Sequence, residues 1–127
     1  MSKEKYSDEF KNKDFKRQVG REELTGIISR HEMWLMDSSK GVKADLSDCF
    51  LRGHRIEQVD LRGANLLGAD LKYTKLRNVK LNGANLKYAN LRSAKLHNVD
   101  FYRANLQGAQ FDYEYLNTAN LEGAFGI

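Results

Sequence analysis

A large apolar residue occupies every fifth position of the chain from Leu46 to Leu121. We call these sixteen positions the centres: Leu46, Leu51, Ile56, Leu61, Leu66, Leu71, Leu76, Leu81, Leu86, Leu91, Leu96, Phe101, Leu106, Phe111, Leu116 and Leu121. A spacing of five fits neither the 3.6-residue period of a helix nor the two-residue period of a strand. The pattern therefore indicates a short repeating unit rather than one long helix or strand.

A second series of small side chains runs two residues before the centres. Alanine, valine, cysteine or threonine fills this position almost throughout, and only His54 and Glu114 interrupt the series. The other three positions of each five are mostly polar, glycine or tyrosine, so they are expected to form the bends and the solvent side. Glycines such as Gly63 and Gly83 stand two residues after a centre, where a corner benefits from their backbone freedom.

A longer period of twenty residues lies on top of the period of five. Val59, Val79 and Val99 are twenty apart, and GANL occurs at residues 63 and 83. Repetition of this kind predicts a coil with four sides that stacks on the next coil. The chain has no proline, which agrees with coils that must offer backbone N–H groups to one another.

Seven segments share the form Ala-Asp/Asn-Leu in a fixed register, and they begin at residues 44, 64, 69, 84, 89, 104 and 119. They resemble the A(D/N)Lxx unit of pentapeptide repeat proteins. The resemblance implies an all-β solenoid, a right-handed quadrilateral β-helix of about four coils over residues 44–126. In that fold the centre and the small residue two before it point inward. With about 4.8 Å per coil, the rod would be on the order of 20 Å long.

The N-terminal third follows a different pattern. Apolar residues recur at helical spacing in residues 21–38, with two glutamates in the first turn where the helix dipole favours them. The predicted buried face contains Leu24, Ile27, Ile28, Trp34 and Leu35, together with His31. We expect this helix to cap the first coil of the β-helix, whose open edge needs a cover. Residues 1–20 are polar and charged and are expected to be a flexible segment.

The C-terminal end of the solenoid is expected to be bare. Only EGAFGI follows Leu121, which is too short for a capping helix. The apolar residues Leu121, Phe125 and Ile127 would then form an association surface, and a homodimer through the C-terminal coil is the preferred interpretation. The alternative is that Phe125 and Ile127 fold back as a minimal plug.

The formal net charge is +4, and its arrangement matters more than its size. Stacking by twenties places Arg52, Lys72 and Arg92 in one outward column. It places Arg55, Lys75 and Lys95 in a second column, with Arg77 nearby. The functional interpretation is a basic stripe that binds an anionic partner. The alternative is that these cations only keep the rod soluble.

The sequence offers no constellation for catalysis or metal binding. Cys49 and His54 are five apart and occupy equivalent inward positions, which favours packing over a nucleophile and its base. The three histidines lack metal-ligand spacing, and no glycine-rich loop suits a phosphate group. We therefore expect no enzyme and no cofactor. A single cysteine and the absence of a long apolar run predict a cytoplasmic protein without a membrane segment.

Two functional classes fit these observations. The first is a small rigid protein-interaction module with an unknown protein partner. The alternative is a nucleic-acid-related role, either direct binding of an anionic polymer through the basic stripe or modulation of a topoisomerase or DNA-binding protein by DNA mimicry. The resemblance suggests mimicry because some pentapeptide repeat proteins have the shape and charge of B-form DNA. Mimicry requires acidic columns and a longer rod, and this sequence departs from both.

Overall fold

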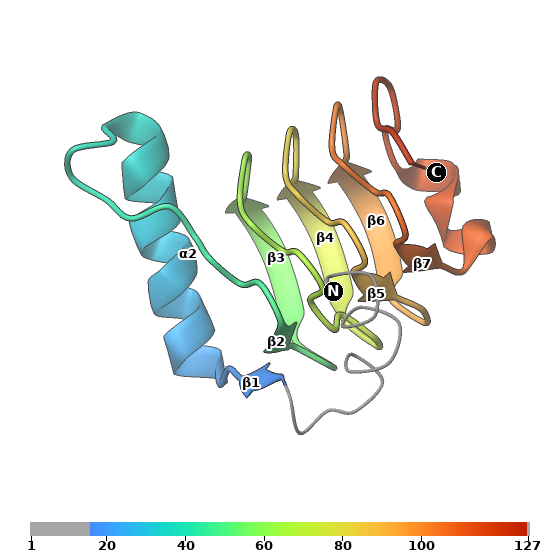
Figure 1. Ribbon diagram of the computed structural model, residues 1–127, viewed down its shortest axis with the longest axis horizontal. Coiled ribbons are helices and arrows are strands. Elements are labelled where there is room, and N and C mark those ends of the chain that lie inside the picture. The colour runs from blue at the N-terminus through green and yellow to red at the C-terminus, as the bar shows by residue number, and fades with distance from the viewer. Residues whose placement is uncertain (1–15, 127) are drawn as a thin grey trace, which may run out of the picture.

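Each coil of the chain pairs with the coil twenty residues further on. The computed structural model describes residues 16–126. Its largest sheet contains β3 (Arg55–Asp60), β4 (Lys75–Lys80) and β6 (Lys95–Asp100), which lie side by side and parallel (Figure 1). Ile56, Leu76 and Leu96 are partners across this sheet.

Shorter pairings repeat the same offset elsewhere on the coils. The strand β5 (Asn90–Leu91) pairs with β7 (Gln110–Phe111). Phe50 in β2 (Cys49–Phe50) forms an isolated parallel bridge with Asp70. Bridges also join residues 45, 65, 85, 105 and 125 in one row. The molecule is therefore a β-helix solenoid whose register is twenty residues.

The centres fill the interior of the solenoid. All of them from Leu46 to Leu116 are buried, while Leu121 is only partly buried. The small residues two positions earlier lie against them, and Ala64, Ala84 and Ala104 are completely buried. A void among the leucines of the first coils measures about 10 Å³, which is too small to hold more than about one water molecule.

A turn follows nearly every centre. The carbonyl of Leu61 accepts a hydrogen bond from the backbone N–H of Ala64 at 3.0 Å, and equivalent bonds recur along the chain. Every fifth residue from Asp48 to Gly108 has a positive φ, between 53° and 76°. Positive φ at the third residue of a turn favours glycine, and Gly63 supplies it without strain. Non-glycine residues such as Tyr73 adopt the same conformation, so the stacked fold imposes it even where the residue does not favour it.

The Asp or Asn that precedes a centre has a role that the sequence analysis did not assign. The Oδ1 atom of Asn65 accepts a hydrogen bond from the backbone N–H of Leu67 at 3.1 Å. Asn85 and Asn105 do the same two residues on, at 3.1 and 3.0 Å. Short polar side chains of this type stabilise turns by satisfying a local backbone donor. This bond gives a physical reason for Asp or Asn in the repeating unit.

The helix α2 (Arg21–Met36) lies across the first coil, beside β3 (Figure 1). Leu24 and Ile28 are buried and Ile27 is partly buried against the core, while Trp34 and Leu35 are half-buried. The helix ends two residues before the predicted boundary. Its apolar face covers the leucines at this end of the solenoid.

His31 fastens the helix to the first coil. The imidazole is completely buried, and its Nδ1 atom accepts a hydrogen bond from the backbone N–H of Ala44 at 2.9 Å. Its Nε2 atom lies 2.9 Å from the carbonyl oxygen of Arg62. Because a carbonyl can only accept, Nε2 carries the hydrogen. The loop after α2 also returns closely to the helix: a Cβ on Gly41 would lie 2.1 Å from the backbone nitrogen of Trp34, so this position requires glycine.

The prediction of a flexible segment over residues 1–20 is wrong for residues 16–20. The strand β1 (Arg17–Gln18) pairs in parallel with β2, and Val19 is buried. The Nζ atom of Lys16 donates to the carbonyl of Gly68 at 2.6 Å, and burial lowers the pKa of Lys16 although Asp70 opposes the shift. The open backbone edge of the first coil explains this pairing. Residues 1–15 lie outside the described part of the chain.

On one side of the last coil a 3-10 helix takes the place of the expected strand. The 3-10 helix η3 (Tyr113–Thr118) lies beside β6, where the register would place a further strand. The Oγ1 atom of Thr118 donates to the carbonyl of Leu96 at 2.9 Å. Glu114, which interrupts the series of small residues before the centres, is exposed. Phe125 is 53% exposed, and Ile127 lies outside the described residues.

Candidate interaction site

The outer face of the β3–β4–β6 sheet carries a column of three cations. The parallel register makes Arg55, Lys75 and Lys95 direct neighbours, and all three are exposed. Within residues 16–126 none of them forms an ion pair with a carboxylate. Neighbouring strands are about 4.8 Å apart, so like charges here repel by about 1 kcal/mol in water. We call these three residues the basic column.

The columns beside it have mixed charge. Glu57, Arg77 and His97 are neighbours in the same register and all are exposed. At the far end of the strands, Asp60, Lys80 and Asp100 form a third row. The face therefore presents a basic edge, an edge with two acids, and a mixed row between them.

The other predicted column serves the fold instead. The Nε atom of Arg52 donates to Asp70 at 2.9 Å, and Arg92 donates to Gln110 at 3.0 Å. The Nζ atom of Lys72 lies 5.4 Å from the centroid of the Tyr73 ring. The sequence pattern does not distinguish the two columns. In the structure, the side chains of this column contact neighbouring side chains, whereas those of the basic column form no ion pair within residues 16–126.

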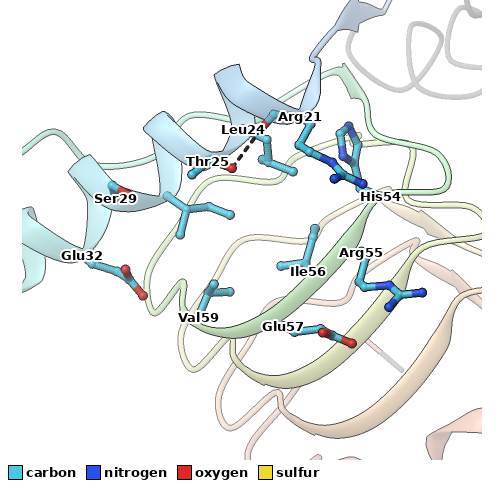
Figure 2. Close-up of a pocket in the computed structure, with 11 residues that line it drawn as sticks. Arg21, Leu24, Thr25, Ser29, Glu32, His54, Arg55, Ile56, Glu57 and Val59 are labelled. Carbon is cyan, nitrogen blue, oxygen red and sulfur yellow. Dashed lines mark hydrogen bonds between the residues drawn. The ribbon is translucent and has the colours of Figure 1, made fainter.

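A groove of about 240 Å³ lies between α2 and β3 (Figure 2). Its apolar wall contains Leu24 and Ile28 from α2 and Ile56 and Val59 from β3. Polar side chains line its rim, and Glu32 crosses it to accept a hydrogen bond from the backbone N–H of Asp60 at 2.9 Å. Sequence reasoning missed this groove because it depends on how the helix packs against a strand twenty or more residues away.

The groove adjoins a wider open hollow of about 550 Å³. We call it the basic hollow, and its lining residues are Arg21, Arg52, Gly53, His54, Arg55 and Lys75. Figure 2 shows Arg21 reaching from the first turn of α2 toward His54, with Arg55 projecting from β3 nearby. The Nε2 atom of His54 lies 2.8 Å from the carbonyl oxygen of Val19 and donates to it. Positive side chains from the helix and from two strands thus share one concave surface.

Cys49 and His54 are both engaged in packing. Cys49 is completely buried, and burial raises the pKa of its thiol, although Arg17 opposes the shift. A thiol in this state is a weak nucleophile at neutral pH. In residues 16–126, no group of three or more His, Cys, Asp or Glu side chains is arranged to hold a metal ion. No helix in the same part of the chain is long and apolar enough to span a bilayer.

The register of twenty and the column of buried centres define a solenoid repeat protein. The family model described as pentapeptide repeats matches residues 42–78, 74–112 and 84–123, with eight copies of the repeat. These matches cover more than half of the chain. The chain belongs to the pentapeptide repeat family.

Solved structures of pentapeptide repeat proteins are similar to this chain. One is alr5209 from Nostoc Pcc 7120, which is 28% identical with a TM-score of 0.55, and the match covers 85% of this chain and 75% of that one. Another is AT2G44920 from the thylakoid lumen of Arabidopsis thaliana, with 29% identity, a TM-score of 0.44 and coverage of 65% and 57%. A third is Rfr23 from Cyanothece 51142, with 31% identity, a TM-score of 0.25 and coverage of 69% and 63%. No protein with a curated description matches the chain.

Proposed function

We propose that this chain is a non-enzymatic protein-interaction module that binds an acidic protein partner on the outer face of β3, β4 and β6. The observation that supports this most is the basic column, whose three cations have no counter-ion among the described residues. The hydrogen-bonded ladder holds these side chains at a fixed spacing, so little backbone ordering is needed on binding. Complementary charge would guide the partner and fix its orientation.

The charge pattern beside the basic column favours a protein over a uniform polyanion. A nucleic acid that covered the whole face would meet Glu57 and Asp100 as well as the cations, while Asp60 is already paired with Arg62 at 2.7 Å. A folded acidic protein can place its own positive groups opposite these carboxylates. DNA mimicry is less well supported, since acids would have to replace the basic column.

Reversal of the basic column tests this proposal. The Lys75→Glu/Lys95→Glu variant should bind the partner at least about tenfold more weakly, because two attractive contacts become repulsive. The measurement is affinity capture with the purified chain, followed by titration of the captured protein. The matched control is Arg30→Glu/Lys40→Glu, which makes the same change in net charge at two exposed positions on or just after α2. Equal binding by both variants, or capture of material that a nuclease removes, would contradict the proposal.

We also propose that two copies associate through their C-terminal coils. Phe125 is half-exposed and Leu121 is only partly buried, so this end presents apolar surface next to a backbone edge. Phe125→Arg should therefore shift the mass measured by sedimentation equilibrium from dimer to monomer. Val42→Arg is the control, since Val42 is also exposed but lies beside α2, where its backbone N–H donates to the carbonyl of Arg30 at 3.1 Å. A monomeric parent chain at micromolar concentration would refute the proposal.

A further inference from the structure

The basic hollow gathers positive charge from three elements. Arg21 comes from the first turn of α2, Arg52 precedes β3, and Arg55 and Lys75 are neighbours across β3 and β4. No carboxylate lines the hollow. Arg21, Arg55 and Lys75 form no ion pair within residues 16–126. These cations repel one another, so a bound anion would lower the electrostatic free energy of this surface.

Asp70 holds one of the cations in place without lining the hollow. Its carboxylate is almost fully buried and accepts the hydrogen bond from the Nε atom of Arg52. The ring of Phe50 lies 5.0 Å from the guanidinium carbon of Arg52 and restrains it further. A guanidinium held at Nε still has its terminal N–H donors. Arg52 is therefore oriented in advance for an acceptor at the mouth of the hollow.

The N-terminus of α2 adds to the positive potential. Gly20 is the N-cap of α2 and provides no side-chain acceptor, so the positive end of this 16-residue helix has no capping side chain. The carboxylates of Glu22 and Glu23 in the first turn offset part of this potential, and Glu23 is already paired with Arg17 at 2.6 Å.

We propose that the basic hollow binds a phosphate monoester dianion. A carboxylate carries one negative charge and two oxygens, whereas a phosphoryl group carries up to two charges on three terminal oxygens. Arginine guanidinium groups bind such oxygens in pairs, and three arginines line this hollow. The hollow is open on one side, so the phosphoryl group can be attached to a larger molecule. This assignment rests on the proposed function in one respect: the carrier of the phosphoryl group would be a side chain of the acidic partner.

Phosphate titration of the ¹⁵N-labelled full chain tests the site directly. Inorganic phosphate should produce saturable shifts of the backbone amides of residues 53–55 at constant ionic strength, and an equal concentration of chloride should not. A phosphoserine peptide should bind more tightly than inorganic phosphate, and the same peptide with serine should not bind. If free phosphate bound as tightly as the phosphopeptide, the proposal that a side chain of the partner carries the phosphoryl group would be wrong.

Three variants separate a site from general attraction to a basic protein. Arg21→Gln and Arg55→Gln should each weaken phosphate binding by about fivefold or more, because each removes a charged donor. Lys95→Gln should change it by less than about twofold, since Lys95 belongs to the basic column but does not line the hollow. All three positions are exposed, and thermal unfolding would check that the variants fold.

Non-saturating shifts, or equal loss in Lys95→Gln and Arg55→Gln, would overturn the phosphate site. That result would leave the proposed function intact if Lys75→Glu/Lys95→Glu still lost the partner. Conversely, phosphate binding with an unaffected partner would contradict the proposed function and retain the site.

Discussion

The Leu86→Asp variant is expected to be unfolded at room temperature. Leu86 is completely buried in a central coil, and its backbone N–H donates to the carbonyl of Asn105 at 2.8 Å. Removal of the leucine loses roughly 1.5 to 3 kcal/mol of burial free energy. A buried carboxylate without a partner adds several kcal/mol to this loss. The total loss approaches the free energy of unfolding of a typical domain, which is about 5 to 15 kcal/mol.

The matched control for Leu86→Asp is the same substitution one residue later. Lys87 is half-buried, and its Nζ atom lies 5.2 Å from the centroid of the Tyr88 ring. Its replacement by aspartate should cost about 1 kcal/mol or less. Far-ultraviolet circular dichroism and urea unfolding measure both variants. A cooperative transition of Leu86→Asp near the parent midpoint would show that the centres do not support the fold as described.

Replacement of His31 by leucine should be the second most damaging change, and it should act on the helix first. The substitution leaves the buried N–H of Ala44 and the partly buried carbonyl of Arg62 without their partner. Each unsatisfied group costs about 1 to 3 kcal/mol, so the free energy of unfolding should fall by about 2 to 6 kcal/mol. Hydrogen exchange should rise more in α2 than in β4.

The control for the His31 variant is His97→Leu. His97 is exposed on the outer face of β6, so the free energy of unfolding should change by no more than about 0.5 kcal/mol. Urea unfolding with hydrogen exchange by mass spectrometry measures both changes. If exchange in α2 and β4 rose equally in His31→Leu, the histidine would not be the specific anchor of the helix.

The sequence predicted the β-helix because the interior of each coil is narrow. Only one large and one small side chain fit inside each side of a coil. Nearly every segment of five residues therefore shows the same pattern of one large apolar residue and one small residue two positions before it. The strand β1 escaped prediction because two residues carry no periodicity, and its partner Cys49 lies more than thirty residues away. The helix η3 leaves one trace in the sequence: Glu114 breaks the series of small residues where the backbone leaves the ladder.

The candidate site was predicted only in part. The sequence periodicity predicted both columns of cations on the surface. It could not show that the column of Arg52, Lys72 and Arg92 contacts neighbouring side chains, whereas the basic column forms no ion pair within residues 16–126. A signal existed, since Arg52 and Arg92 each donate to a side chain eighteen residues later, just before a centre of the next coil. The basic hollow had no such signal. It forms only when Arg21, on a helix outside the repeats, packs beside Arg55 and Lys75.

The two periods of the chain have different consequences for how such a protein can change in length. Duplication of twenty residues, for example 65–84, would add a coil and extend the basic column by one cation, because the copied segment contains Lys75. Insertion of five residues would keep every leucine buried but turn all later side chains onto the neighbouring side. Lys95 would then leave the face of Arg55. Insertions of any multiple of five residues therefore preserve the buried interior, whereas only multiples of twenty residues preserve the arrangement of side chains on the exposed face.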